Sequence, residues 1–230
     1  MTVGIVGGIG PESTIDYYRQ IIAAYRKQKA DGSYPSIVIN SIDAQKMLGM
    51  IAANELAGLA ESLVGEVQKL AKAGVDFGVL AANTPHMVFE EIRERSPIPL
   101  ISIVEATCAE ANAQGLKRLG LFGTRFTMQG RFYPDVFSKE GIALVLPSEE
   151  EQTCIHEKYL GELVNGVFLP ETRARLLVIA DRLRDHEAIQ GLILGGTELP
   201  LILKDVKDRG ISFLDTTQIH VAAIVDRLVA

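Results

Sequence analysis

The amino-acid sequence predicts an α/β protein built from two similar halves, each with a mostly parallel sheet. Short apolar segments of strand length alternate with longer amphipathic segments along the chain. That alternation is typical of parallel strands joined by helices that cover both faces of the sheet. Small and polar residues follow several of the strand-like segments, and the carboxyl ends of parallel strands are where such sheets usually bind ligands. An internal repeat then divides the chain in two.

The repeat consists of two pairs of similar segments. VGIVGG (3–8) matches LGLFGT (119–124), and FGVLAANT (77–84) matches GLILGGT (191–197). The separations are also similar, since Thr84 follows Gly8 by 76 residues and Thr197 follows Thr124 by 73. Self-similarity at a nearly constant separation indicates that both halves follow one structural plan.

The elements of the first half follow from apolar periodicity and turn residues. Pro11 suits the first turn of a helix, where the N–H that it lacks would have no partner. Asn54 is expected to cap a helix that ends before Gly74, and a short helix is expected over 85–95. The apolar stripe of the first helix is expected to comprise Ile15, Tyr18, Ile22 and Tyr25. The predicted strands are 3–6, 36–39, 75–81 and 100–104.

The sequence of the second half predicts the same alternation of strands and helices. Helices are expected over 149–163, 172–184 and 217–228. The predicted strands are 119–122, 142–146, 192–194 and 211–214.

Composition and charge exclude several classes of function. No apolar run approaches the roughly 20 residues that span a bilayer, and the first residues lack the basic start of a signal peptide. The net charge of −6, without a basic cluster, argues against nucleic acid or an anionic membrane as a partner. Cys108 and Cys154 are far apart and form no CxxC pattern, so neither a disulfide framework nor a metal site is expected. A reducing cytoplasm is the expected compartment.

Four loops at strand ends are candidate ligand-binding segments: 7–14, 82–86, 123–127 and 195–198. If the halves face each other, these loops can line one cleft between them, which is a common place for a small ligand. The first loop, Gly7-Gly8-Ile9-Gly10, lacks the third glycine of a dinucleotide motif and the Gly-Lys-Ser/Thr of a P-loop. Gly8, Ile9 and Gly10 are expected either to hold a carboxylate or phosphate through backbone N–H groups or to form only a tight turn.

Short neutral donors follow the strand-like segments in both halves. Asn83 and Thr84 come from the first half, and Thr124 and Thr197 come from the second. Such side chains suit a small carboxylate ligand without requiring a metal. They are equally suited to cap helices, and for Thr84, which precedes a proline, capping is a strong alternative.

His86 and Glu198 are the titratable residues nearest to these loops. Both can serve in general acid/base catalysis, or His86 can be a structural hydrogen-bonding residue and Glu198 a first-turn helix residue. Asp43 follows a strand and is expected to contact ligand or to cap the next turn. Cys108 is expected to be a small buried apolar residue. Cys154 and His156 are two positions apart on a predicted helix, so their side chains should point apart.

Five segments together resemble the aspartate/glutamate racemase superfamily, in its amino-acid racemase branch. They span nearly the whole chain in the family's order: GIVGGIGPEST (4–14), LAANTPH (80–86), GLFGTRFTM (120–128), LILGGTELPLIL (192–203) and FLDTTQIH (213–220). The resemblance implies two α/β domains related by a pseudo-twofold, with the C-terminal helix returning to the first. We therefore expect domains at 1–98 plus 212–230 and at 99–211. Members are typically homodimers that need no cofactor.

The resemblance also implies a two-base mechanism, in which one thiol removes the α-proton of an amino acid and a second thiol delivers one. The first cysteine of the family lies in a CNT motif and the second in a GCTE motif. In this chain the matching positions hold Ala82 and Gly196, and neither side chain can exchange a proton. The parts implied to bind substrate, including Gly8–Gly10, Asn83 and Thr84, are present.

Several functions therefore stay open. The chain can be a cofactor-independent isomerase in which His86, Glu198 or water replaces the thiols. It can be a lyase or decarboxylase relative that stabilises a carbanion, or a protein that binds a small amino acid or dicarboxylate without turnover. Engineered replacement of both cysteines is a further explanation, although glycine fits it poorly. In aspartate-selective relatives an arginine after the second strand reads the side-chain carboxylate; here Gln45 and Lys46 occupy that region, and Gln45 suggests a broader specificity.

Overall fold

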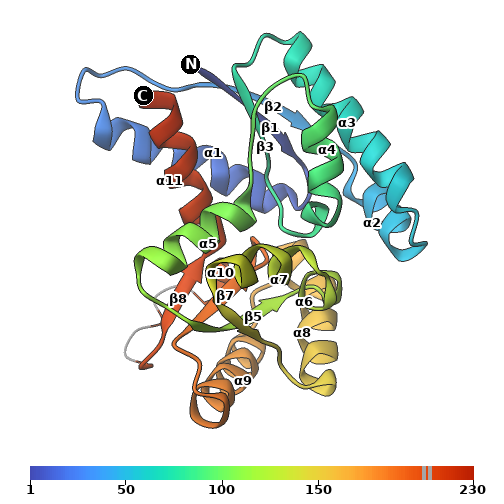
Figure 1. The fold of residues 1–230 in the computed structure, drawn as a ribbon, viewed down its shortest axis with the longest axis vertical. Coiled ribbons are helices and arrows are strands. Elements are labelled where there is room, and N and C mark those ends of the chain that lie inside the picture. Colours follow the sequence, from blue (N-terminus) through green and yellow to red (C-terminus); the bar gives the residue numbers. More distant parts are fainter. Residues whose placement is uncertain (204–205, 207–208) are drawn as a thin grey trace. The chain divides into compact units, whose positions relative to one another are not determined.

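The protein consists of two compact units, and the computed structural model describes residues 1–203, 206 and 209–230. The first unit comprises Met1–Ile103 with His220–Ala230, and the second comprises Val104–Ile219. Both contain a sheet whose strands all pair in parallel (Figure 1). No helix among the described residues is long and apolar enough to cross a membrane.

The first unit is built on a four-stranded sheet with the order β2-β1-β3-β4. Its strands are β1 (Thr2–Gly7), β2 (Ser36–Ser41), β3 (Phe77–Leu80) and β4 (Leu100–Ile101). Its helical segments are α1 (Pro11–Gln28), α2 (Ala44–Ala52), α3 (Leu56–Lys72), the 3-10 turn η1 (Thr84–Val88), α4 (Phe89–Arg95) and most of α11 (Thr216–Val229). Every described residue of β3 is buried, which marks it as a central strand.

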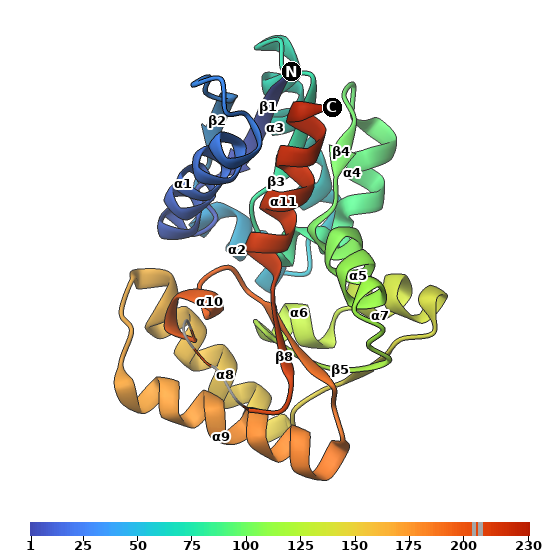
Figure 2. The ribbon, with the colours of Figure 1, turned by 90° about the vertical axis from the view of Figure 1, so that its left-hand side faces the viewer.

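The two faces of this sheet are covered by different helices. Val3 and Ile5 of β1 belong to one core cluster with Tyr17 and Ile21 of α1 and with Ile224 of α11. Figure 2 shows α1 and α11 side by side at this sheet. Side chains alternate along a strand, so residue 4 points to the other face, and an added Cβ at Gly4 would lie 3.1 Å from a methyl carbon of Leu70 in α3. The sheet is therefore buried on both faces, as a parallel sheet requires.

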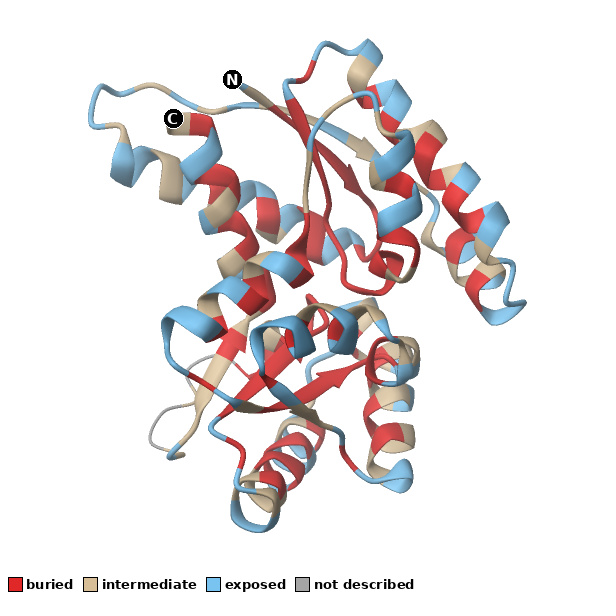
Figure 3. Ribbon diagram, in the orientation of Figure 1, coloured by how far each residue is buried: buried red, intermediate tan, exposed pale blue. Residues whose placement is uncertain are grey.

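The predicted stripe of α1 was wrong for its first half, although Tyr25 packs against the core as expected. Ile15 and Tyr18 are exposed, while Tyr17 and Ile21 are buried. Figure 3 shows buried and exposed segments alternating along the helices. The polar residues Ser13 and Thr14 are buried at the start of the helix, because their hydroxyls bond the backbone of the preceding loop. That polar first turn rotates the buried face away from the apolar residues that mark the stripe in the sequence.

Asn54 does not cap the start of α3, whose N-cap residue is Glu55. It instead follows the C-cap residue of α2, where its N–H donates to Ile51 O at 3.0 Å and helps to close that helix. It has a positive φ of 56° and lies in the turn that joins α2 to α3. Asparagine is one of the few residues that tolerate this backbone region. The sequence prediction missed α2, a short helix of nine residues, and so assigned Asn54 to the wrong role.

The predicted strand at 100–104 ends at residue 101, and α5 (Ile103–Ala113) follows almost at once. Two buried histidines bond the backbone at this junction. Ile101 O accepts a hydrogen bond from His220, and Ile103 N donates one to His86. These side chains satisfy backbone groups that a longer strand would have paired with its neighbour.

The second unit repeats the first with the strand order β6-β5-β7-β8. Its strands are β5 (Arg118–Gly123), β6 (Ala143–Val145), β7 (Gly191–Gly195) and β8 (Ser212–Asp215). Its helices are α5, α6 (Arg125–Gln129), α7 (Phe132–Phe137), α8 (Glu149–Gly161), α9 (Pro170–Glu187) and α10 (Leu199–Ile202), with 3-10 turns at Ser138–Glu140 and Leu163–Asn165. The equivalent order of the two sheets is what the internal repeat indicates.

Helices α8 and α9 pack on one face of the second sheet. Leu192 and Leu194 of β7 share a core cluster with Ile155 of α8 and Leu183 of α9. A capping box defines the start of α8, because Ser148 and Glu151 each bond the other's backbone N–H.

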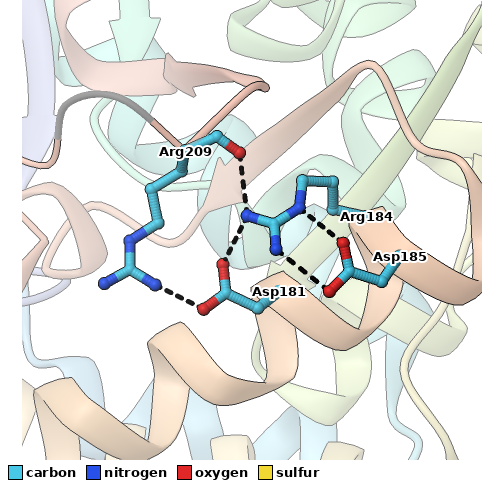
Figure 4. Close-up of polar contacts among 4 residues, drawn as sticks. All are labelled: Asp181, Arg184, Asp185 and Arg209. Carbon is cyan, nitrogen blue, oxygen red and sulfur yellow. Dashed lines mark hydrogen bonds and ion pairs between the residues drawn. The ribbon is translucent and has the colours of Figure 1, made fainter.

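An ion-pair network joins α9 to the residue at position 209 (Figure 4). Arg184 contacts Asp181 at 2.8 Å, and its guanidinium also donates to the carbonyl of Arg209 at 2.9 Å. Arg209 pairs with the same aspartate, and Arg184 contacts Asp185 at 2.7 Å. Single exposed pairs contribute little, but this network shares its charges among several partners.

The predicted domain boundaries differ from these units at two places. Leu100–Ile101 pairs with β3 in the first sheet, although the boundary at 98 assigns it to the second domain. Ser212–Asp215 pairs with β7 in the second sheet, although the boundary at 212 assigns it to the first. Strand pairing thus holds each segment in its own sheet.

Gly8 provides a test of the turn that follows β1. Its φ is +83°, and an added Cβ would lie 2.4 Å from Ile42 O. Gly32 has a similar φ of +80° with nothing within 4 Å, so it is a matched control. We expect Gly32→Ala to lower the free energy of unfolding by about 1 kcal/mol. Gly8→Ala should cost at least about 2 kcal/mol more, because backbone must also move. Urea titration measures both; equal losses would contradict the steric argument.

Candidate functional site

The loop after β1 is held by its own hydrogen bonds. The N–H of Gly8 donates to the Thr14 hydroxyl at 2.8 Å, and the Ser13 hydroxyl donates to Gly10 O at 2.8 Å. Ile42 N donates to Gly7 O at 2.9 Å, which joins the loop to the end of β2. Gly8, Ile9 and Gly10 are buried. The Gly8 N–H is thus engaged within the loop, and a ligand at this loop has to use other groups.

A cavity of about 280 Å³ lies in the first unit, between the end of β2 and helices α2 and α3. Its charged lining residues are Asp43, Lys46, Glu66 and Lys69. Burial raises the pKa of Glu66, but hydrogen bonds from Lys69 and Asn40 outweigh it and hold the pKa below its usual value. Opposite charges therefore balance within the cavity.

Asp43 caps α2, which was one of its two predicted roles. Its carboxylate accepts a hydrogen bond from Gln45 N at 2.9 Å. Lys46 lines the cavity described above, whereas Gln45 is not among the residues that line it.

Asn83, Thr84 and His86 follow β3 and are all buried. His86 Nδ1 lies 3.0 Å from Ala82 O, and its Nε2 lies 3.3 Å from Ile103 N. A carbonyl can only accept and an amide N–H only donates, so the proton is on Nδ1 and Nε2 is an acceptor. Both ring nitrogens are thus bound to backbone, which supports the structural alternative for His86.

His220 has the opposite tautomer in the same unit. Its Nε2 donates to Ile101 O at 3.1 Å, and its Nδ1 accepts from the Tyr17 hydroxyl at 2.9 Å. Burial, together with the neighbouring His220, lowers the pKa of His86 to about 3. Burial lowers the pKa of His220 to about 4. Both rings are therefore neutral near pH 7.

Thr124 follows β5 and caps α6. Its hydroxyl accepts a hydrogen bond from Thr127 N at 3.2 Å, and the two hydroxyls lie 3.2 Å apart. Capping and ligand binding can coexist, because a helix start has more than one N–H to satisfy.

Neither cysteine joins the candidate loops. Cys108 is buried in α5, and burial raises the pKa of its thiol. Cys154 is half-buried in α8, and His156 accepts a hydrogen bond from Arg125 N at 3.1 Å. No group of histidine, cysteine and acidic side chains suited to a metal ion occurs in the described part of the chain.

The carboxyl end of β7 holds Gly196, Thr197 and Glu198, all buried. An added Cβ at Gly196 would lie 2.4 Å from Cε2, 2.8 Å from Cζ and 2.8 Å from the hydroxyl oxygen of Tyr159. The tyrosine ring thus fills the space into which any side chain at position 196 would project. A side chain at 196 would therefore fit only if the buried Tyr159 ring shifted.

Tyr159 also binds Glu198. Its hydroxyl donates a hydrogen bond to Glu198 Oε2, and the Thr197 hydroxyl donates to the same oxygen at 3.1 Å. Burial and then the charge of Glu198 raise the pKa of Tyr159 well above its usual value. Sequence reasoning missed Tyr159, because it lies 39 residues before Glu198 on a different element and matches no motif.

The candidate residues gather at strand ends within each unit. Gly8 and Asn83 follow the paired strands β1 and β3, and Thr124 and Thr197 follow the paired strands β5 and β7. The carboxyl ends of neighbouring parallel strands meet at one edge of a sheet. Each unit therefore presents one polar edge, and in the second unit that edge includes the Tyr159–Glu198 pair.

The two buried histidines predict how stability depends on pH. Their native pKa values, about 3 and about 4, lie below the 6.5 of an exposed histidine, so the unfolded chain binds more protons. Their contribution is complete above pH 6.5 and declines as pH falls towards 4, by up to about 1.4 kcal/mol per pH unit for each histidine. His220→Asn should reduce the slope of unfolding free energy between pH 4 and 6.5. Replacement of the exposed His186 by Asn is the control; equal slopes in both variants would refute the assignment.

Comparison with known proteins identifies the family. The model of a family described as Asp/Glu/Hydantoin racemase matches residues 6–224. The broad specificity amino-acid racemase RacX of Bacillus subtilis (strain 168) is 26% identical over 216 residues, which cover 89% of this chain and 88% of the relative. An aspartate racemase homologue from Pyrococcus horikoshii OT3 is 29% identical with a TM-score of 0.83, over 100% of this chain and 99% of that one.

A more distant structure shares the fold. Glutamate racemase from Aquifex pyrophilus is 19% identical with a TM-score of 0.63, over 99% of this chain and 84% of that one. The family match, the relatives and the repeated parallel sheets agree: this chain belongs to the Asp/Glu/Hydantoin racemase family.

Proposed function

We propose that this protein binds a small amino acid or dicarboxylate, as a cofactor-independent member of its family, and that its catalysis does not use two thiols. The observation that carries the proposal is the packing at Gly196. Tyr159 occupies the space that a cysteine side chain would need, so the change at 196 extends to the surrounding structure. Ala82, at the other position that the resemblance assigns to a cysteine, has no group that exchanges protons.

The substrate-binding role rests on Gly8, Ile9, Gly10, Gln45, Asn83, Thr84, Thr124 and Thr197. Gly8 shapes the loop, because its own N–H bonds Thr14, and the neutral donors of the other residues suit a carboxylate. RacX, a relative named for broad specificity towards amino acids, supports an amino-acid ligand of no single side-chain class. Glu198 stays a candidate catalytic residue, and His86 is a weaker one because backbone groups occupy both of its nitrogens. The resemblance further favours a homodimer in the cytoplasm, which light scattering and fractionation would test.

A second function is binding without turnover. The same replacements at 82 and 196 favour it, because they remove proton-exchanging side chains while the binding residues remain. A lyase or decarboxylase activity would likewise need fewer bases than racemisation.

Incubation in D₂O distinguishes these functions. The protein is mixed with the L and D forms of alanine, aspartate, asparagine, glutamate and glutamine; calorimetry reports binding, and NMR reports exchange of the α-proton and inversion. We expect binding of at least one of these amino acids, without the rapid inversion of a two-thiol racemase. If none binds, the proposed function is wrong. Rapid inversion would instead show that other bases replace both thiols.

The packing at Gly196 predicts a strong coupling between two substitutions. Gly196→Cys should lower the melting temperature markedly, because its Cβ would overlap the Tyr159 ring. Tyr159→Leu removes the three overlapping atoms, so the double variant should be more stable than the sum of the single losses by about 1–3 kcal/mol. Additive losses would contradict the packing argument. Ala82→Cys, alone and combined with the double variant, then tests whether a restored thiol pair racemises amino acids.

A further inference from the structure

The second unit buries an acid and a hydroxyl together at the edge of its sheet. Glu198 is 1% exposed and Tyr159 is 6% exposed. Transfer of a carboxylate out of water costs several kcal/mol unless hydrogen bonds compensate for the lost hydration. Here Tyr159 and Thr197 both donate to Glu198 Oε2. Packing alone does not require an acid at this position, and buried titratable groups with specific partners concentrate at functional sites.

The position of the pair also points to function. Glu198 follows β7 by three residues, beyond the carboxyl end of a central strand. In open parallel sheets that end is the ligand-binding edge. Thr124, another candidate binding residue, follows the neighbouring strand β5.

The Tyr159 hydroxyl lies close to the point at which a side chain at 196 would begin. It is 2.8 Å from the Cβ position that a side chain at Gly196 would have. A phenol oxygen is thus present beside position 196, where glycine has no side chain that could exchange a proton. Its own hydrogen bond runs to Glu198, so a proton accepted by the oxygen has a route onwards.

We propose that Tyr159 and Glu198 form a proton relay, in which the Tyr159 hydroxyl takes the α-proton of a bound amino acid while its own proton passes to Glu198. The Cα–H bond breaks, a new O–H bond forms on Tyr159, and the original phenol O–H bond is exchanged for one on Glu198 Oε2. The carboxylate becomes neutral and the substrate becomes a carbanion, so the charge balances. The proposal rests on the amino-acid binding proposed above and names the base that acts at that site.

A relay suits a tyrosine that does not ionise by itself. Burial and the charge of Glu198 raise the pKa of Tyr159 well above its usual value, so free tyrosinate is not an available base. Passing the phenol proton to the carboxylate during the transfer avoids a separate tyrosinate. Both are then catalytic residues, because Tyr159 takes the α-proton and Glu198 receives the phenol proton.

The relay also determines the stereochemical outcome. Alanine at position 82 supplies no second proton-exchanging group. A single pair removes and returns the proton on the same face of the α-carbon, so configuration is retained. Deuterium should therefore enter the substrate from D₂O, from one enantiomer only and without inversion.

Two substitutions test the relay with the intact protein. Tyr159→Phe keeps the ring that fills the space at Gly196 but removes the hydroxyl, and Glu198→Gln keeps the shape but cannot accept the proton. We expect each to slow α-deuteration of the bound amino acid at least about 100-fold, in the range of general acid/base effects. Calorimetric affinity should change by only a few-fold. Glu198→Asp, which keeps a carboxylate, should recover part of the exchange.

Tyr133→Phe is the matched control. Tyr133 is another fully buried tyrosine of the second unit, whose hydroxyl bonds Thr107, and it should leave exchange within a few-fold of the natural protein. Melting curves verify that each variant is folded at the assay temperature.

Each result decides between the two proposals. Binding without any exchange in the natural protein overturns the relay and leaves the binding function in place. Exchange that persists in Tyr159→Phe, or that is lost equally in Tyr133→Phe, also overturns it. If none of the amino acids tested in D₂O binds, both the proposed function and the relay fail.

Discussion

Parallel pairing of buried central strands is the constraint on which this molecule depends. Strands β3 and β7 are buried along their full length, so a polar side chain within them would lose its hydration without compensation. Polar side chains first become tolerable immediately beyond the carboxyl ends, where loops and helix starts provide partners. Asn83 follows β3 in this way, and Thr197 follows β7. The same pairing that stabilises each sheet therefore determines where its chemistry can be.

A glycine and a tyrosine form one complementary unit at the end of β7. The ring of Tyr159 needs the absence of a side chain at 196, and the hydroxyl then reaches Glu198. Either residue by itself would be unfavourable: glycine would leave a void beside a buried carboxylate, and tyrosine beside any larger residue would clash. The contact joins packing and electrostatics, because the atoms that fill the space also satisfy the acid.

Histidine has a different role in the first unit. His86 and His220 bond backbone groups at the end of β4, a strand of only two residues. The two rings have opposite tautomers, because His86 donates to a carbonyl from Nδ1 and His220 donates to a carbonyl from Nε2. Neutral imidazole is well suited to this junction, since it supplies both a donor and an acceptor in a dry environment. The junction between β4 and α5, near residue 102, is thus stabilised by side chains from η1 and α11.

The sequence by itself determined the position of the strands and their parallel class through apolar periodicity, and the division into two similar sheets through the internal repeat, because these depend on patterns that are local or repeated. It also determined the loops at strand ends, as the positions of Asn83, Thr124 and Thr197 show. Local patterns could not determine which face of α1 is buried, where β4 ends, or that His86 would bind backbone on both sides. Only the tertiary structure placed Tyr159 against Gly196 and Glu198. A contact between residues 39 positions apart depends on how α8 packs on the sheet, and no local sequence pattern predicts it.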